Sequence, residues 1–321
     1  MKKEKFIRKI NKYTANGTPY LFVMDFELQK PFVCKISNLE KNNVFYSIKG
    51  VGNLEQSKSE KNIFIKPKPL NKKNYKIGFD TVKSEILKGN SYLLNLTFPT
   101  KIKTKNSLSE IIYQAKADYK LFFKNKFISF SPESFIQIKD NKIYTFPMKG
   151  TIDALIPDAK KTLLDDKKET YEHNTIVDLM RNDLAMVSTD IKVNRFRYVE
   201  TIKTSKGAIL QVSSEIEGTL PKNWKDTFGE ILYKLLPAGS ISGAPKPKTL
   251  EIIRHAEQGK RGFYTGVFGV FDGSSVDSAV LIRYIEKKKQ KLIYRSGGGI
   301  TSKSNLDFEY DEMLQKIYIP K

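Results

Sequence analysis

Short apolar runs alternate with segments of helical periodicity along almost the whole chain, and this alternation most restricts the fold. The clearest runs lie at 21–26, 45–48, 92–97 and 127–130. They are rich in aromatic and aliphatic side chains, as strands are. No repeat, low-complexity stretch or clear linker interrupts the pattern. Many strands interleaved with helices predict a single α+β domain.

Helical periodicity is strongest at 168–186, where apolar side chains recur on one face. The stretch 107–123 shows the same period, so we expect a helix there as well. We expect the last helix to begin at Ser304, because Ser304 and Asp307 have the spacing of a capping box, with Asp in the usual place of Glu.

Cysteine and histidine are too scarce for most metal or disulfide frameworks. The single cysteine, Cys34, excludes a disulfide framework and a thiolate zinc site, and it indicates a reducing compartment. With only His173 and His255 present, any metal should be a hard cation bound by carboxylates. The basic N-terminus leads into no apolar signal core, and no apolar run is long enough to cross a membrane. We therefore expect a cytoplasmic protein that does not enter membranes.

The formal net charge is +21, which is compatible with two classes of protein. One is a basic nucleic-acid-binding protein. The other is a lysine-rich protein whose charge is spread over a solvated surface. The lysines are scattered, and no aromatic-flanked basic motif of the RNA-binding type occurs. This favours the second class, in which the positive field would attract a small anionic substrate.

The stretch Phe146–Thr151 places a lysine in unusual surroundings. A strand expected at 142–146 ends at Pro147, which has no N–H to donate, and Gly150 leaves space beside Lys149. If Lys149 is desolvated there, its pKa falls and its neutral amine becomes a nucleophile. The alternative is a lysine whose stem packs on the strand end while its amine stays in water.

Acidic residues on two expected helices could form an oxygen-ligand site. Glu172 lies early in one helix, while Glu309 and Glu312 share a face of the last helix, and Lys316 extends that row. If these carboxylates converge, they would bind Mg²⁺ that keeps several waters and takes the substrate as a further ligand. The alternative is a set of exposed surface charges.

Two glycine-rich segments, 237–247 and 296–300, could be loops that bind anions through backbone N–H groups, or ordinary tight turns. Glu133, at the end of a strand, could be a general acid. Arg283 lies inside an expected strand, where an arginine requires an anionic partner. Together these residues suggest a small polyanionic substrate, a magnesium ion, an acid and an amine nucleophile.

The order of these motifs resembles that of the chorismate-utilising enzymes, which include anthranilate, aminodeoxychorismate, isochorismate and salicylate synthases. The resemblance covers roughly residues 75–321. It rests on Ser131–Glu133, Pro147–Thr151, Glu172–His173, Asp178–Leu184, Pro237–Lys246, Ile282–Arg283, Ser296–Ile300, Glu309–Glu312 and Lys316.

The resemblance implies an α/β sandwich of two antiparallel-rich sheets with flanking helices, formed by one chorismate-binding domain over residues 1–321. Residues 1–75 would be a shortened N-terminal subregion and 76–321 the catalytic core. It also implies chorismate as the substrate, Mg²⁺ as the cofactor, and the following roles. Metal ligands would be Glu172, Glu309 and Glu312; substrate contacts would be Arg283, Ser242, Gly298, Gly299, Lys316 and Thr151; Glu133 would protonate the departing C4 hydroxyl.

Within the family, the residue at Lys149 separates the branches. The resemblance implies alanine there in anthranilate, isochorismate and salicylate synthases, and a lysine that adds to C2 of the ring in aminodeoxychorismate synthases. Leu93 stands where the water-adding members have a basic lysine, which argues against their chemistry. We therefore expect an aminodeoxychorismate synthase component I that serves 4-aminobenzoate and folate synthesis, with anthranilate synthase component I as the nearest alternative.

The resemblance further implies that ammonia comes from a separate glutaminase subunit, because the chain has no cysteine-based glutaminase domain. Two departures affect the details of substrate contact: Gln211 stands where many relatives have histidine, and Ala238 replaces a common glycine. No tryptophan pocket is evident in residues 1–75, so we do not expect inhibition by tryptophan.

Overall fold

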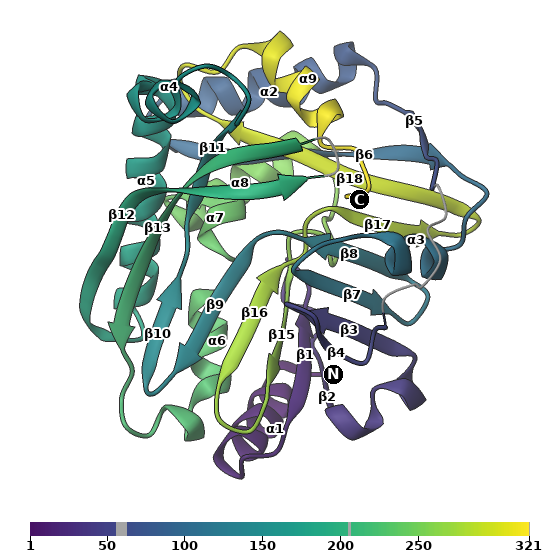
Figure 1. The fold of residues 1–321 in the computed structure, drawn as a ribbon, viewed down its shortest axis with the longest axis vertical. Helices are drawn as coiled ribbons and strands as arrows, with labels where there is room; N and C mark the ends of the chain where they lie inside the picture. Colours follow the sequence, from purple (N-terminus) through teal and green to yellow (C-terminus); the bar gives the residue numbers. More distant parts are fainter. Residues whose placement is uncertain (56–62, 205–206, 321) are drawn as a thin grey trace.

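The fold described here is a computed structural model of residues 1–55, 63–204 and 207–320. Two antiparallel sheets form its centre, and helices flank them (Figure 1). This confirms the expected sandwich. Among the described residues, no helix is long and apolar enough to cross a lipid bilayer.

Within the described residues, the first sheet contains nine strands. Along the sheet they are β11 (Met148–Asp153), β13 (Gly207–Thr219), β10 (Lys142–Thr145), β9 (Ser134–Lys139), β16 (Val276–Val280), β15 (Val267–Phe271), β1 (Tyr20–Met24) and β2 (Phe32–Lys35), with β12 (Thr189–Thr204) pairing with β13.

The second sheet also contains nine strands in the part of the chain that the structure describes. Their order is β14 (Gly243–Ala244), β6 (Leu93–Lys103), β18 (Lys291–Ile300), β17 (Tyr284–Lys288), β8 (Phe127–Ser131), β7 (Tyr119–Phe123), β3 (Val44–Ile48) and β4 (Val51–Gly52), with β5 (Lys66–Lys68) pairing with β6. Residues 1–75 thus contribute strands to both sheets.

The two sheets pack face to face because their facing side chains are apolar. Leu21 and Phe268 of the first sheet join Leu121 and Phe127 of the second in one buried cluster. A larger cluster joins strand residues such as Phe22 and Val276 to helix residues such as Phe228. A third cluster includes the buried face of helix α3 (Leu108–Gln114).

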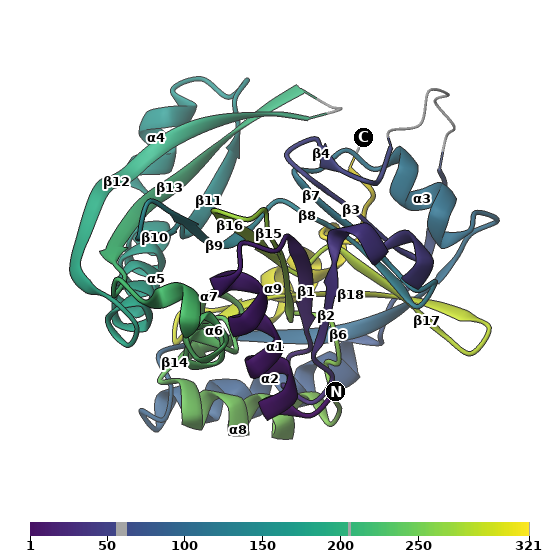
Figure 2. The same ribbon diagram turned by 90° about the horizontal axis from the view of Figure 1, so that it is seen from below.

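The helices are α1 (Lys3–Ala15), α2 (Lys72–Leu87), α3 (Leu108–Gln114), α4 (Ala159–Asp165), α5 (Lys167–Ala185), α6 (Phe228–Leu235), α7 (Gly239–Ser242), α8 (Lys246–Glu257) and α9 (Leu306–Gln315), with 3₁₀ turns at Ile36–Asn38, Glu40–Asn42 and Trp224–Asp226. Seen from below, α1, α2 and α8 lie on one side, while β12 and β13 curve toward the opposite side (Figure 2).

The expected helix at 107–123 is wrong in its second half. A capping box at Ser107 and Glu110 starts α3, but the helix ends at Gln114 and β7 follows at Tyr119–Phe123. The run Tyr119–Phe123 is buried throughout and pairs with β3 and β8. A continuous apolar run carries no period that separates a buried strand from a helix, so sheet pairing decided its structure.

Candidate active site

The glycine-rich segment 296–300 forms the open end of β18. β17 pairs with β18 only up to Tyr284, opposite Arg295, because the chain turns at Arg283 with a φ of +48°. β6 pairs with β18 as far as Ile300. The expectation of a loop at 296–300 was therefore wrong: glycines here bring two strands close, since a Cβ on Gly297 would lie 2.2 Å from the Leu96 carbonyl oxygen.

The peptide groups of this open edge face away from β6. Gly297 accepts a hydrogen bond at 3.1 Å from Lys316 Nζ, while the N–H of its neighbour on β6, Thr97, donates to Glu257 instead. In an antiparallel strand the N–H and C=O of one residue point to the same side. Gly297 and, two residues on, Gly299 therefore present their peptide groups to the open edge.

The amine of Lys149 lies beside this edge. Lys149 is in β11, and its Nζ donates to Glu172 Oε2 of α5 at 3.4 Å. The same Nζ lies 3.2 Å from the position that a Cβ on Gly299 would take, and Leu93 Cδ1 lies 3.1 Å from that position. The amine is thus enclosed by a carboxylate, an apolar methyl group and a bare stretch of backbone.

A hydrogen-bond chain fixes β11 against α5. His173 of α5 contacts Ser214 Oγ at 2.7 Å, and the Ser214 N–H donates to the Pro147 carbonyl just before β11. Burial, followed by the nearby charges of Arg197 and Lys149, lowers the pKa of His173 to about 4. A neutral histidine therefore occupies this contact at neutral pH.

The acidic residues of α9 meet the other face of β18. Glu309 Oε2 and Glu312 Oε1 each lie 3.5 Å from the position that a Cβ on Gly298 would take. Ser304 Oγ donates to Glu309 Oε1 at 2.6 Å, and Lys316 Nζ donates to Glu312 Oε1 at 2.6 Å. The absence of a side chain at Gly298 thus leaves space that two carboxylates border.

The expected start of α9 at Ser304 was wrong by one residue. Asn305 is the N-cap, and its side chain accepts hydrogen bonds from the N–H groups of Asp307 and Phe308. Ser304, no longer needed as a cap, holds Glu309.

Glu133 lies between β8 and β9, and Arg283 lies just before β17. Burial raises the pKa of Glu133, while a hydrogen bond from Ser240 and the charges of Lys149, Arg283 and Lys316 oppose this shift. Arg283 is stacked over Tyr318, with 5.1 Å between its guanidinium carbon and the ring centre. The Glu133 carboxyl therefore lies within electrostatic reach of the side chains of Lys149, Arg283 and Lys316.

Two of the expected residues, Ser242 and Thr151, take no part in these contacts. Ser242 is fully buried, and its hydroxyl donates to the Ala238 carbonyl at 2.8 Å. Thr151 is exposed on β11, opposite Gln211. Ser240, which the sequence did not single out, is the serine of this loop that lowers the pKa of Glu133.

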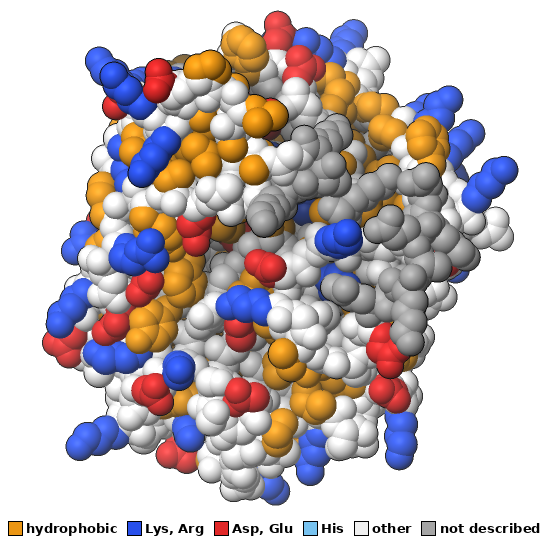
Figure 3. Space-filling view, in the orientation of Figure 1, with side chains coloured by type: hydrophobic (Ala, Val, Ile, Leu, Met, Phe, Trp, Pro, Cys, Tyr) orange, Lys and Arg blue, Asp and Glu red, His pale blue; other side chains and the backbone are white. Residues whose placement is uncertain are grey.

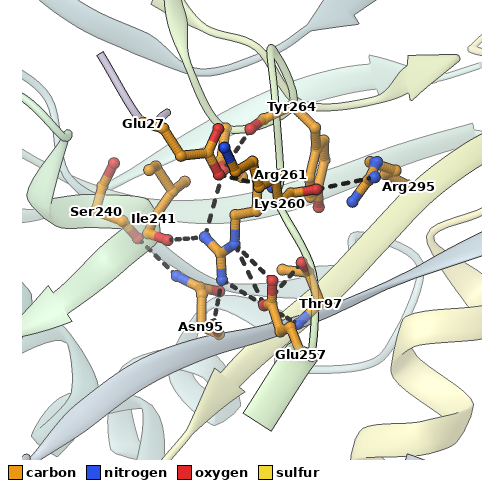
Figure 4. A network of polar contacts seen from close by, with 11 residues as sticks. Glu27, Asn95, Thr97, Ser240, Ile241, Glu257, Lys260, Arg261, Tyr264 and Arg295 are labelled. Atoms are coloured by element: carbon orange, nitrogen blue, oxygen red, sulfur yellow. Dashed lines mark hydrogen bonds and ion pairs between the residues drawn. The ribbon is translucent and has the colours of Figure 1, made fainter. Parts of the chain in front are cut away.

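A buried network behind the site was also missed. Arg261 is 1% exposed and bonds to Glu257, to the Asn95 and Ile241 carbonyls and to Thr265 (Figure 4). These residues come from separate parts of the chain, so no local motif reveals them. The pair Lys246–Asp183, at 2.8 Å, anchors the same loop from α5.

Metal binding depends on how closely the carboxylates approach. Within the described ranges, no group of three or more His, Cys, Asp or Glu side chains is arranged to hold a metal ion. Glu309 and Glu312 do border one space at Gly298. Glu172 pairs with Lys149, whose Nζ lies 3.2 Å from the position that a Cβ on the neighbouring Gly299 would take.

The surface charge agrees with a spread of solvated lysines. On the face drawn in Figure 3, basic side chains are distributed around the rim, and acidic and basic side chains meet near the centre. This face carries no single continuous basic patch.

Three comparisons with known proteins place the chain among its relatives. The family model described as "chorismate binding enzyme" matches residues 35–320. An uncharacterized PabA-like protein of Pasteurella multocida is 53% identical over 317 residues, covering 98% of both chains. The aminodeoxychorismate synthase component 1 of Salmonella typhimurium is 34% identical over 198 residues, which are 59% of this chain and 42% of the relative.

Relatives with the other activity are equally similar. The anthranilate synthase component 1 of Aeropyrum pernix is 35% identical over 202 residues, covering 59% of this chain and 44% of the relative. The solved structure of anthranilate synthase component I from Streptococcus pneumoniae has a TM-score of 0.67 at 26% identity, covering 79% of this chain and 58% of that one. The chain thus spans less than half the length of the two named synthases.

Proposed function

Because the chain belongs to the chorismate binding enzyme family, we propose that it converts chorismate and ammonia to 4-amino-4-deoxychorismate, with Lys149 as a covalent nucleophile. The observation that carries the proposal is the position of the Lys149 amine. It lies at the glycine edge of β18, beside Glu172 and Leu93. Family membership also favours an enzyme over the nucleic-acid-binding alternative.

In the proposed reaction, the neutral Lys149 amine attacks C2 of the ring. Both conjugated ring double bonds shift by one position, the C4–O bond breaks, and Glu133 gives its proton to the leaving hydroxyl, which departs as water. Ammonia then attacks C4, both double bonds shift back, and the C2–N bond breaks to release the lysine. Covalent catalysis of this kind divides one displacement into two easier steps.

Glu133 suits the part of the acid because burial raises its pKa, so a larger fraction stays protonated near neutral pH. Arg283 and Lys316 supply positive charge for the carboxylates of chorismate, and the peptide groups of Gly297 and Gly299 offer donors at the same edge. The roles expected for Ser242 and Thr151 would require movement on substrate binding, since neither faces this space directly.

The residues present also fit Mg²⁺. Magnesium is commonly held by one or two carboxylates together with waters and substrate oxygens, and Glu309 and Glu312 border the space left at Gly298. Glu172 would complete the acidic set from α5. When bound, Mg²⁺ would supply positive charge that holds a ring carboxylate. Without a metal ion, Glu172 pairs with Lys149 and Glu312 pairs with Lys316.

We propose that ammonia reaches this site from a separate glutaminase subunit. The named synthases among the relatives are each called component 1, which supports a two-component enzyme. In the presence of an ammonium salt, the chain should act without that partner.

Product analysis with chorismate, Mg²⁺ and an ammonium salt tests the proposal. We expect 4-amino-4-deoxychorismate, and we expect Lys149→Ala to lower its formation at least 100-fold, because the covalent path is lost. Lys161→Ala, an exposed lysine of α4, is the matched control and should leave turnover unchanged. Anthranilate as the product would support the alternative synthase. Unchanged turnover of Lys149→Ala would remove the nucleophile from the mechanism.

A further inference from the structure

Asn95 of β6 lies directly opposite Gly299 of β18, beside the amine of Lys149. Residues that face each other in an antiparallel pair carry their side chains on the same face of the sheet, with Cβ atoms about 5 Å apart. The Lys149 amine lies on that face, because its Nζ is 3.2 Å from the position that a Cβ on Gly299 would take. Gly299 therefore puts no side chain between Asn95 and the amine.

The side-chain amide of Asn95 has one end bound and one end free. Its Nδ2 donates to the Ser240 carbonyl of α7 at 3.0 Å, which identifies the nitrogen, since only the nitrogen can donate to a carbonyl. Its Oδ1 accepts no hydrogen bond from the described part of the chain. Nor is Oδ1 one of the described buried atoms that lack a partner. The oxygen of this half-buried residue is therefore an acceptor that is open to solvent.

The backbone on both sides of this amide is fixed by Arg261. Arg261 Nη2 donates to the Asn95 carbonyl at 2.6 Å, and its Nη1 donates at 3.0 Å to the Ile241 carbonyl, which follows Ser240 (Figure 4). The strand that carries Asn95 and the turn that binds its side chain are thus positioned by one buried guanidinium. The direction of Oδ1 is set before any ligand arrives, as a binding group requires.

An acceptor at this position selects the group that can meet it. An amide oxygen has no proton to donate, so the carboxylates of chorismate cannot bind to it. The proposed reaction brings two hydrogen-bond donors near the amine of Lys149, namely the C4 hydroxyl, which leaves, and ammonia, which replaces it. Ammonia has three N–H donors and one lone pair. An acceptor behind it therefore turns the lone pair toward the carbon that it attacks.

We propose that Asn95 binds ammonia, accepting an N–H at Oδ1 and turning the lone pair toward C4. The inference rests on the proposed function, in which ammonia adds at C4 after Lys149 has added at C2. The lone pair forms the C4–N bond, both double bonds shift back and the C2–N bond breaks. The extra proton on the C4 nitrogen passes to the Glu133 carboxylate, which restores the acid. Asn95 neither gives nor takes a proton.

Two substitutions separate the free oxygen of Asn95 from its bound nitrogen. Asn95→Leu keeps a similar shape and removes both polar atoms, so the KM for ammonium should rise about 2- to 10-fold, the effect of one neutral hydrogen bond. The KM for chorismate should not change. Asn95→Asp keeps an acceptor oxygen and loses only the donor to Ser240, so its KM for ammonium should stay near that of the unaltered protein. Its charge should lower kcat, because it stabilises protonated Lys149, so KM is the quantity to compare.

The experiment measures initial rates of 4-amino-4-deoxychorismate formation by the whole chain with Mg²⁺ at one pH. Ammonium chloride is varied at saturating chorismate, and chorismate is then varied at saturating ammonium. Asn74→Leu and Asn74→Asp, at an exposed position of α2, are the matched controls and should leave both KM values unchanged. If Asn95→Leu does not fold, Asn95→Val gives the same comparison with a side chain that suits a strand.

The outcomes separate this inference from the function on which it rests. If the unaltered chain forms no 4-amino-4-deoxychorismate, the proposed function is wrong and the inference fails with it. If the product forms, an unchanged KM for ammonium in Asn95→Leu would overturn only the role of Asn95. Equal increases in the leucine and aspartate variants would also overturn it, because they would trace the effect to the bond with Ser240. An increase in the KM for chorismate alone would assign the oxygen to the C4 hydroxyl and overturn the binding of ammonia.

Discussion

The ion pair between Arg261 and Glu257 allows a stability prediction. Both side chains are almost completely buried, at 1% and 5% exposure, and Arg261 Nη2 lies 2.6 Å from Glu257 Oε1. Glu257→Gln would leave the guanidinium as an uncompensated charge in the interior. Breaking a buried pair in this way costs about 3–5 kcal/mol of unfolding free energy.

This magnitude converts to a change in melting temperature. At about 2.1 cal/mol/K per residue, a chain of 321 residues has an unfolding entropy of roughly 0.7 kcal/mol/K. The expected decrease in Tm is therefore about 4–7 °C. Calorimetry or a circular-dichroism melt would measure it, and denaturant unfolding would give the free energy independently.

The same helix offers a matched control. Lys248 and Glu251 of α8 form an exposed pair at 2.9 Å, with 43% and 69% of their side chains exposed. Glu251→Gln should change the unfolding free energy by less than about 1 kcal/mol. If Glu257→Gln were no more destabilising than Glu251→Gln, Arg261 would not depend on Glu257, and the reasoning from burial of the pair would fail.

Two further predictions follow from the contacts around Lys149. Folding lowers the pKa of His173 from 6.5 to about 4, so its contribution to stability is complete above pH 6.5 and is lost as the pH falls toward 4. This amounts to about 3 kcal/mol, which urea titrations at successive pH values would detect, and His173→Gln should flatten the dependence. For Gly299→Ala, the new Cβ would lie 3.2 Å from Lys149 Nζ, so the amine must shift by a few tenths of an ångström. We expect a several-fold lower kcat, and an unchanged kcat would show that the amine reacts from another position.

The sequence predicted the elements whose patterns are local. The helix expected at 168–186 is α5 at Lys167–Ala185, and the strand expected at 142–146 is β10 at Lys142–Thr145. The pattern was misleading where burial was complete. Tyr119–Phe123 is apolar on both faces of a strand, so its composition fitted a helix equally well.

Of the candidate site, only the residues that lie in recognisable sequence motifs could be predicted. Lys149, Glu172, Glu133, Arg283 and Lys316 were identified from the sequence, and the structure places them around the end of β18. Their roles stay predictions until turnover is measured.

Long-range contacts explain what was missed. Arg261 reaches Asn95, 166 residues away along the chain, and Thr97 donates to Glu257, 160 residues away. Such partners become neighbours only when the sheets assemble, so no spacing in the sequence indicates them. The segment 296–300 was taken for a loop because glycine disfavours strands in general, while here close strand pairing requires it.

β17 leaves residues 296–300 of β18 without a partner on one side among the described strands. This has a consequence for how the enzyme could diversify. If the proposed substrate binds where β18 loses its neighbour, it meets main chain rather than side chains, and a point mutation cannot remove a peptide N–H other than by introducing proline. Mutations that change the product should therefore accumulate on β11, α9 and the turn at Ser240, while the glycine-rich part of β18 stays unchanged. A library that randomises those three segments and keeps residues 296–300 would be expected to alter products without abolishing substrate binding.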